Sequence, residues 1–466
     1  MALLATSNLY VADGGNDDNG GAHDPTYGGD YSLANQDSPV AIIDGGSVTG
    51  TITSGSPAYF STNASGRGST WNGLALNIIS GSGVTTGRYT LSNWDGGSDR
   101  FQLVSYGGAS GTISSGRIGG RLKTVGGAGA AHVGGNTIWN VGETFISSGT
   151  SNVPGGRLVL SNAASNRPSA LRGCASLPDD GGYGTVTFTG PDTAQYMLTG
   201  SNNGWFDRLI VDTAGLGSIG GIANSNSNNY TTRCRFKNHV GAARYALNGN
   251  GVFFNHFDTP TTANNSLVCT CNGLMVGNTF ICRATGSAAK VCVPSAANTA
   301  IGNWVYCTAA HVRAMEIFST FFIANNSCHG ARMQISGALT MARLVINNVV
   351  GGISASVRAF DFSDSDPMQM FLMHSNATYG LSGGATAYDP AKVTPSNQLD
   401  LPSSPFTDPT SLDFRLANNA GALMLRQSGW QEFLRMSDVI SGFPDIGAIQ
   451  ARSGGGSLIN SGLIRS

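Results

Sequence analysis

The chain has 466 residues, of which 66 are glycine and 38 asparagine but only 4 are lysine and 3 glutamate. Glycine and asparagine disfavour helices, and the lysine and glutamate of amphipathic helical faces are nearly missing, which excludes a largely helical fold. An apolar content of 40% with a formal net charge of −1 excludes a disordered chain and offers no basic excess for nucleic acid. We expect a β protein with two or more structural modules.

The first eight residues carry no lysine or arginine and only a short apolar run. A secretory signal needs a basic start and a longer apolar stretch. The longest apolar segments, such as residues 315–324, are too short and too polar to span a bilayer. These features predict a protein assembled in the cytoplasm, with no membrane insertion.

Residues 39–130 predict an antiparallel module, either a sandwich or a barrel. Long alternating strands are expected at residues 75–79, 88–92 and 100–105, and glycine-rich turns separate them. A module placed just inside the N-terminus suits attachment to a particle or partner.

Residues 131–395 predict a parallel β-helix. Less regular strands are expected at residues 137–141, 157–160 and 185–189. From about residue 205 to 380, short apolar strands recur with asparagine or another polar residue at a fixed position. These anchors are Asp212, Arg233, Asn255, Asn278, Asn303, Asn325, Asn347 and Asn376, with offsets of 21, 22, 23, 25, 22, 22 and 29 residues.

A spacing near 22 residues fits one coil of a β-helix, whose coils must stack because none can bury its apolar face alone. Equivalent positions then lie about 4.8 Å apart, so that like residues form ladders. Asparagine tolerates the left-handed conformation of a sharp corner and can hydrogen-bond along the stack.

The eight cysteines could be buried thiols, disulfides or metal ligands. They are Cys174, Cys234, Cys269, Cys271, Cys282, Cys292, Cys307 and Cys328. Cys282, Cys307 and Cys328 follow their anchors by four, four and three residues, which predicts an inward-facing row of thiols. Cys269 and Cys271 lack the second cluster of a zinc site.

Residues 396–466 predict a terminal coil and cap, and the one helix expected in the chain lies at residues 430–436.

Both ends of the chain resemble the right-handed parallel β-helix superfamily that includes the pectate lyases. The opening Asn8-Leu-Tyr-Val-Ala-Asp-Gly-Gly-Asn-Asp-Asp-Asn-Gly-Gly resembles the strand and turn that begin such helices, here within residues 1–38. The segments Leu412-Asp-Phe-Arg-Leu-Ala and Pro444-Asp-Ile-Gly-Ala-Ile-Gln resemble the terminal coil.

The module between the ends is similar to modules of phage-encoded β-helix virion proteins, in Gly81-Ser-Gly-Val-Thr-Thr-Gly-Arg-Tyr-Thr-Leu and in Arg117-Ile-Gly-Gly-Arg-Leu. This resemblance implies an all-β chain with an inserted N-terminal antiparallel module and a C-terminal capping segment. The chain departs from the usual start, because Asp30-Tyr-Ser-Leu-Ala-Asn leads into the inserted module.

Polysaccharide-cleaving β-helices need two carboxylates across a groove, or Asp-held calcium with a basic residue. Paired glutamates are improbable because only Glu143, Glu316 and Glu432 exist. The aspartates that could form an acid/base or calcium site are Asp207, Asp212, Asp258, Asp361, Asp364 and Asp366, and the alternative is that they cap turns.

Three further groups of residues have a functional and a structural interpretation. Asp13, Asn16, Asp17, Asp18 and Asn19 could hold calcium, or could form a plain turn. His256, His329 and His374 fall near the anchors and could titrate, although solvated corners are commoner; the other histidines are His23, His132, His239 and His311. Trp205, Phe206, Trp304 and Tyr306 could stack on sugars, or could be core residues.

We therefore predict no catalytic, cofactor or metal-binding set. The expected function is a bacteriophage virion structural protein, a spike, fibre or capsid-decorating protein that contacts other virion proteins and possible host glycans, as a trimer. The alternatives are a tailspike depolymerase or lyase acting on host polysaccharide, and a cell-surface adhesin.

Overall fold

The computed structural model describes residues 3–4, 7–21, 33–163, 167–176, 178–191, 195–226, 228–240, 244–259, 267–283, 290–294, 299–308, 313–317, 322–335, 343–354, 356–362, 371–411, 413–417 and 419–425. These residues fall into two compact units. The first comprises residues 1–214 and 221–234, and the second comprises residues 215–220 and 235–466.

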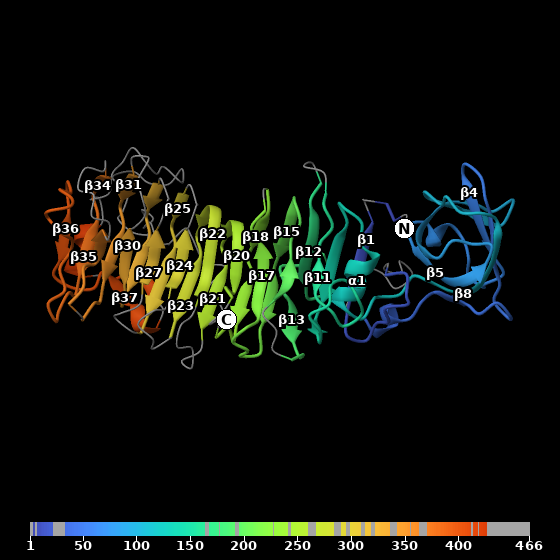
Figure 1. Cartoon of the computed structure of the whole chain (residues 1–466), viewed down its shortest axis with the longest axis horizontal. Coiled ribbons are helices and arrows are strands. Elements are labelled where there is room, and N and C mark those ends of the chain that lie inside the picture. Colours follow the sequence, from blue (N-terminus) through green and yellow to red (C-terminus); the bar gives the residue numbers. More distant parts are fainter. Residues whose placement is uncertain are drawn as a thin grey trace. The chain divides into compact units, whose positions relative to one another are not determined.

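The inserted module of the first unit is an antiparallel barrel (blue in Figure 1), which decides between the two predicted forms. Its strands are β2 (Ala41–Ile43), β3 (Gly50–Thr53), β4 (Ala58–Thr62), β5 (Ala75–Ser82), β6 (Gly87–Asp95), β7 (Arg100–Leu103) and β8 (Gly111–Ile118). The order β8-β3-β4-β7-β6-β5 closes because β5 also pairs with β8, and β2 pairs with the end of β8. Alternating residues of β3, β4 and β7 fill the interior, with Phe60 and Phe101 fully buried.

The rest of the first unit is built from short parallel strands, as predicted for β-helix coils. They are β1 (Asn8–Val11), β9 (Thr137–Val141), β10 (Glu143–Ile146), β11 (Leu158–Val159), β12 (Ser169–Cys174), β13 (Gly184–Phe188), β14 (Tyr196–Thr199), β15 (Gly204–Asp207), β16 (Leu209–Asp212), β17 (Gly220–Asn224) and β18 (Tyr230–Thr232). Strand β1 pairs in parallel with β9 although the whole barrel lies between them in the sequence.

The second unit has the same architecture. Its parallel strands are β19 (Arg235–Lys237), β20 (Leu247–Phe253), β21 (His256–Thr259), β22 (Leu267–Val276), β23 (Thr279–Cys282), β24 (Lys290–Pro294), β25 (Thr299–Ile301), β26 (Trp304–Cys307), β27 (Arg313–Ile317), β28 (Phe322–Ala324), β29 (Ser327–His329), β30 (Arg332–Ile335), β31 (Arg343–Ile346), β32 (Val349–Gly351), β33 (Phe360–Phe362), β34 (Phe371–His374), β35 (Ala377–Tyr379) and β36 (Leu399–Leu401). Each strand pairs with its counterpart one coil later, which confirms the parallel β-helix (Figure 1).

The predicted asparagine ladder is present in the second unit, but Asn325 and Asn347 were placed one residue too early. The predicted anchors Asp212, which ends β16, and Arg233, at a left-handed corner, are not members of it. The members are Asn255, Asn278, Asn303, Asn326, Asn348 and Asn376, and each of the first five donates its backbone and side-chain N–H to the Oδ1 of the next. Asn325 and Asn347 instead occupy the left-handed corners just before, with φ of 55° and 54°. Both errors arise in Asn-Asn pairs, where either residue fits the spacing.

The row of thiols is shorter than predicted for the same reason. Cys282 and Cys307 are direct partners on β23 and β26, but Cys328 lies opposite Val305. The ladder residue of this coil is Asn326, so Cys328 comes only two residues after its anchor. It therefore takes the strand position that Val305 has in the previous coil, and not the position of Cys307. The seven described cysteine side chains are buried free thiols, and the side chain of Cys292 lies outside the description.

The described helices were not predicted. They are α1 (Val125–Ala131) and α2 (Ala420–Leu425), with the 3-10 turns η2 (Ala34–Asp37), η3 (Ser69–Trp71) and η4 (Pro409–Ser411). The sequence of α1, Val-Gly-Gly-Ala-Gly-Ala-Ala, has poor helix propensity. It forms because Thr124 caps it, accepting from the N–H of Gly127, and because burial favours its small residues. The predicted helix at residues 430–436 lies outside the described residues.

Past β36 the chain leaves the parallel stack, and the predicted capping role of this segment stays a prediction. Strands β37 (Phe406–Asp408) and β38 (Asp413–Leu416) form an antiparallel pair. Phe406 packs edge-on against Tyr379, with ring centroids 5.9 Å apart, in a buried cluster that includes Trp304 and Leu401. The hairpin therefore covers apolar side chains on one side of the β-helix.

Candidate functional site

Asp207, one of the aspartates that sequence analysis selected, is the centre of a polar cluster in the first unit. It is the last residue of β15, in which Phe206 is fully buried and Trp205 half-buried. Because side chains alternate along a strand, Phe206 points into the core, and Trp205 and Asp207 point outward. The Asp207 side chain is nevertheless 0% exposed, so neighbouring side chains must cover it.

The covering groups are two arginines and a threonine. Oδ1 of Asp207 accepts from Thr232 Oγ1 at 2.7 Å and from Arg233 Nε at 2.8 Å. Oδ2 accepts from Arg233 Nη2 at 2.6 Å and from Nε and Nη2 of Arg172, both at 3.3 Å. Such charge-assisted and bidentate bonds compensate a buried carboxylate. With both oxygens engaged, Asp207 anchors the cluster and is poorly suited to transfer protons or bind a cation.

Arg172 is held between two tryptophan rings as well as by Asp207. Its guanidinium carbon lies 4.6 Å from the ring centroid of Trp139 and 4.7 Å from that of Trp205. The ring of Trp205 is itself oriented, because its Nε1 donates to Thr232 Oγ1 at 2.8 Å. A cation between two aromatic faces is stabilised by roughly 0.5–2 kcal/mol per face. Arg172 is therefore preorganised, with 12% of its side chain exposed.

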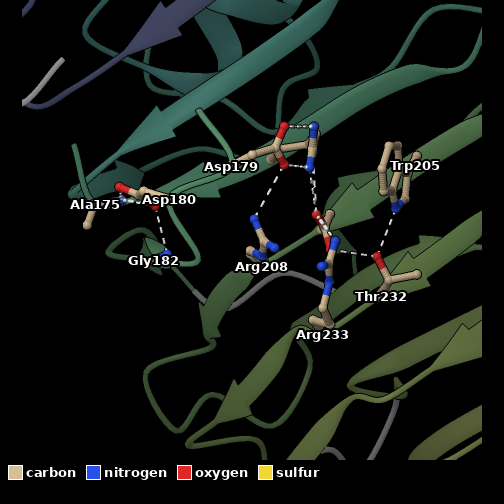
Figure 2. Close-up of polar contacts among 10 residues, drawn as sticks. Ala175, Asp179, Asp180, Gly182, Trp205, Arg208, Thr232 and Arg233 are labelled. Atoms are coloured by element: carbon tan, nitrogen blue, oxygen red, sulfur yellow. Dashed lines mark hydrogen bonds and ion pairs between the residues drawn. The ribbon is translucent and has the colours of Figure 1, made fainter. Parts of the chain in front are cut away.

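A second carboxylate reaches the cluster from a turn, as Figure 2 shows. Asp179 forms a bidentate ion pair with Arg172, in which Nη1 donates to Oδ2 at 3.2 Å, and Arg208 Nη1 lies 3.4 Å from Asp179 Oδ1. The neighbouring Asp180 accepts from the backbone N–H groups of Ser176 and Gly182, both at 2.7 Å. Asp180 thus ties the turn together, while Asp179 is 58% exposed at its tip.

Two of the arginines occupy unusual backbone positions. Arg208 and Arg233 have φ of 53° and 54° and stand at corners between strands, where later coils place Gly277, Gly302 and Asn325. A left-handed conformation is uncommon for a residue with a long side chain. In two successive coils this corner therefore carries an arginine that pairs with a carboxylate, Arg208 with Asp179 and Arg233 with Asp207. The ion pairs offset the backbone strain of the left-handed conformation.

The outer strand face beside the cluster carries aromatic residues. Trp205 of β15 and Tyr230 of β18 are register partners, and Tyr230 is 43% exposed. The three arginines face two aspartates, and Asp180 of the same turn brings the formal charge of the site to zero. The arrangement combines aromatic surface with fixed guanidinium donors, which suits binding of a polar ring with an anionic substituent.

The other selected aspartates do not join this cluster. Asp212 ends β16, in a different sheet from Asp207, and its Oδ1 accepts from the Ala214 N–H at 2.8 Å. Asp258 pairs with Arg283, and Asp361 pairs with Arg332 at 3.2 Å. These contacts fit structural roles in turns and ion pairs. Asp364 and Asp366 lie outside the described residues.

The acidic cluster near the N-terminus organises the start of α1. Oδ1 of Asp17 accepts from the backbone N–H of Lys123 at 3.1 Å and of Thr124 at 2.9 Å, and its Oδ2 accepts from Thr124 Oγ1 at 2.8 Å. Asp18 lies 3.8 Å from Arg117. These contacts match the structural interpretation of Asp17. Among the described residues, no three His, Cys, Asp or Glu side chains form a group suited to a metal ion.

The histidines near the anchors are separate from the cluster. Burial lowers the pKa of His256 to about 4. His329 stacks on Tyr306, and its Nδ1 lies 2.6 Å from the hydroxyl of Tyr379. His374 Nδ1 lies 2.6 Å from Ser375 Oγ. His132 and His239 are buried, and His23 and His311 lie outside the described residues.

Of the four aromatics that could stack on sugars, Trp205 has an outward position beside the polar cluster. Phe206 is a core residue, 0% exposed, and Trp304, 3% exposed, belongs to the apolar cluster at the C-terminal hairpin. Tyr306 is half-buried against the same cluster. The core interpretation therefore holds for Phe206 and Trp304.

Sequence analysis missed Arg172, Trp139 and Asp179, and it named Arg233 only as an anchor of the repeat. The arginines Arg172 and Arg233 lie 35 and 26 residues from their partner Asp207, and the early coils lack the regular asparagine that sets the register later. The one available clue was arginine at Arg208 and Arg233, one coil apart, at a corner where glycine and asparagine are the usual residues.

Comparisons with known proteins show no family for this chain. No protein-family model matches the chain, and no curated protein matches it. Among solved structures, the crystal structure of pectate lyase Pel9A is similar, with 15% identity, a TM-score of 0.38, and coverage of 71% of this chain and 91% of that one. Within the described residues, no helix has the length and apolar character needed to cross a membrane.

Proposed function

We propose that this chain is a non-enzymatic virion structural protein, a spike, fibre or decoration protein whose β-helix contacts host glycans through the cluster around Asp207. One observation carries the binding role: Asp207 is fully engaged by Arg172, Arg233 and Thr232, beside the outward rings of Trp205 and Tyr230. A carboxylate held in this way supports a rigid binding surface, whereas glycoside hydrolysis needs a carboxyl group free to exchange a proton.

Placement on a phage particle rests on different support. The segments at residues 81–91 and 117–122 resemble modules of phage-encoded β-helix virion proteins, and the inserted barrel gives the chain a second module that could attach it to a particle. A stacked parallel core with paired backbone groups suits an exposed particle protein, because it leaves few open segments for proteases. We propose a trimer, the state this resemblance implies.

The binding role is tested with the purified full chain on an array of bacterial surface polysaccharides. We expect retention that drops at least tenfold in Trp205→Ala and in Tyr230→Ala. Tyr59→Ala is the matched control, since Tyr59 lies in the barrel under Arg100, and it should bind like the wild type. Absence of binding to every polysaccharide would contradict the proposal.

The same samples separate adhesion from depolymerisation. We expect the size distribution of bound polysaccharide, measured by size-exclusion chromatography, to stay constant over days. Shortening of the polymer that Asp258→Asn or Asp207→Asn abolishes would establish the enzyme alternative instead. Electron microscopy of native particles with a labelled antibody tests the placement, and light scattering of the purified chain should give three times the 47.9 kDa chain mass.

A further inference from the structure

Asp179 is the most exposed charged residue of the cluster. Arg172 is stacked between two tryptophans, and Asp207 is 0% exposed beneath the arginines. Asp179 is 58% exposed, on a turn of its own. Solvent already reaches Asp179, and a ligand carboxylate that replaced it would form the same bidentate bonds, so the exchange costs little.

The guanidinium group of Arg172 keeps its position without Asp179. Arg172 has the two ring contacts and two bonds to Asp207, and its side chain is 12% exposed. The backbone of Arg208 is fixed at a left-handed corner, and its side chain is 17% exposed. If Asp179 moved away, the three arginines would face Asp207, with Asp180 at the base of the turn, and the formal charge of the site would be +1. The donors left without Asp179 would be Nη1 and Nη2 of Arg172 and Nη1 of Arg208.

We propose that Arg172 and Arg208 form a binding site for the carboxylate of an acidic sugar, and that Asp179 occupies this site as an intramolecular competitor. The inference rests on the proposed function and names the ligand class of the same surface. The planar guanidinium of Arg172 can donate two hydrogen bonds to a ligand carboxylate, as it donates two to the carboxylate of Asp179. The ring that bears the ligand carboxylate then lies on the outward aromatic surface at Trp205 and Tyr230.

The turn has the construction that such a competitor requires. Asp180 fixes the base of the turn through the N–H groups of Ala175, Ser176 and Gly182. Asp179, Asp180 and Gly181 are exposed, and Gly181, with φ of 84°, has nothing within 4 Å of the position that a Cβ would take. The tip can therefore withdraw Asp179 while Asp180 keeps the turn folded.

The test is calorimetric binding of alginate oligosaccharides, whose sugars all carry carboxylates, and of the same oligosaccharides after reduction of the carboxyls to alcohols. Asp179→Asn should bind the acidic form roughly three- to fivefold more tightly than the wild type, because it removes an exposed competitor. Arg208→Asn should lose that binding at least tenfold while keeping its unfolding midpoint, because asparagine is accepted at equivalent corners such as Asn325. Arg67→Gln, which disturbs only the barrel pair with Asp99, is the matched control.

The outcomes separate this inference from the proposed function. Equal binding of acidic and reduced oligosaccharides, lost in Trp205→Ala, would overturn the carboxylate site and leave glycan adhesion standing. No binding of either form, together with no retention on the array, would overturn both. Tighter binding of a polyglutamate peptide than of alginate by Asp179→Asn would overturn the sugar ligand, and would assign the site to an acidic protein segment.

Discussion

The side-chain nitrogen of Asn303 lies 2.9 Å from Oδ1 of Asn326, and the same bond joins Asn278 to Asn303. Asn303 also donates to the carbonyl of Met275 at 3.1 Å. Each ladder member therefore satisfies polar groups of the coils before and after its own, deep inside the corner of the β-helix.

Replacement of one ladder member should destabilise the whole unit. Asn303→Ala leaves the buried donors of Asn278 and the carbonyl of Met275 without their partner, at roughly 1–3 kcal/mol for each unsatisfied group. We expect a clearly lower midpoint of guanidinium unfolding. Asn202→Ala, at an exposed position, is the matched control and should unfold like the wild type. Equal midpoints for the two variants would contradict the role of the ladder.

Acid should destabilise the fold through buried His132. Burial lowers its pKa from 6.5 to about 4. Between these values the unfolded chain binds more protons, so the stabilisation is complete above pH 6.5 and is lost as the pH falls toward 4. At about 1.4 kcal/mol per pKa unit, the loss is roughly 3 kcal/mol.

The variant His132→Gln should weaken the dependence of the unfolding midpoint on pH between 6.5 and 4, and His256, whose pKa burial also lowers to about 4, accounts for part of the dependence that remains. Asp44→Asn is the control, because hydrogen bonds from Ser47 and neighbouring N–H groups lower the pKa of Asp44 to about 2. Its contribution is present above pH 3.8 and is lost only below it. A slope in the variant as steep as in the wild type would assign the acid sensitivity to other groups.

The two carboxylates of the cluster should differ in their effect on stability. Asp207→Asn leaves Arg172 and Arg233 facing a buried neutral group, and removal of one partner of a buried pair costs up to roughly 3–5 kcal/mol. Arg233 is 36% exposed, so we expect about 2 kcal/mol. Asp179→Asn should change the free energy of unfolding by less than about 1 kcal/mol. Similar losses in urea titrations of both variants would be inconsistent with these roles.

The described cysteines should be unreactive in the folded chain. Burial raises the pKa of Cys174 and of Cys271 to about 12, and it raises those of Cys234, Cys307 and Cys328 further. Because the thiolate is the nucleophile, iodoacetamide at pH 8 should label these five residues only after denaturation. Peptide mass spectrometry gives the labelling of each site, and rapid labelling of native Cys307 would contradict its burial.

The sequence revealed the β-helix because its repeat is local: one asparagine per coil and a strand on either side of it. The same regularity misplaced Asn325 and Asn347 by one residue, since spacing alone cannot choose within an Asn-Asn pair. Helix α1 went unnoticed because its glycines fit only a buried site, as at Gly126, where a Cβ would lie 2.1 Å from the carbonyl oxygen of Val153. Packing overrides propensity at such a position.

The site was predicted only at single residues. Asp207 and Trp205 drew attention as an aspartate and an aromatic at possible cleft positions, but their joint role depends on Arg172 and Arg233, one coil away on either side. Which residues meet across coils follows from the register, and the early coils vary too much in length to fix it. Asp179 depends in addition on the path of a turn, which no periodic pattern describes.

The barrel enters and leaves the first coil at one place. Gly20 and Gly21 donate to the carbonyls of Gly119 and Gly120, both at 2.8 Å, and a Cβ on Gly20 would lie 2.0 Å from the carbonyl oxygen of Ala75. The two connections therefore run side by side, and β1 and β9 would remain register partners around any insert whose ends are as close. The barrel is therefore an insertion that another domain with equally close ends could replace, and the coils of the β-helix would need no change.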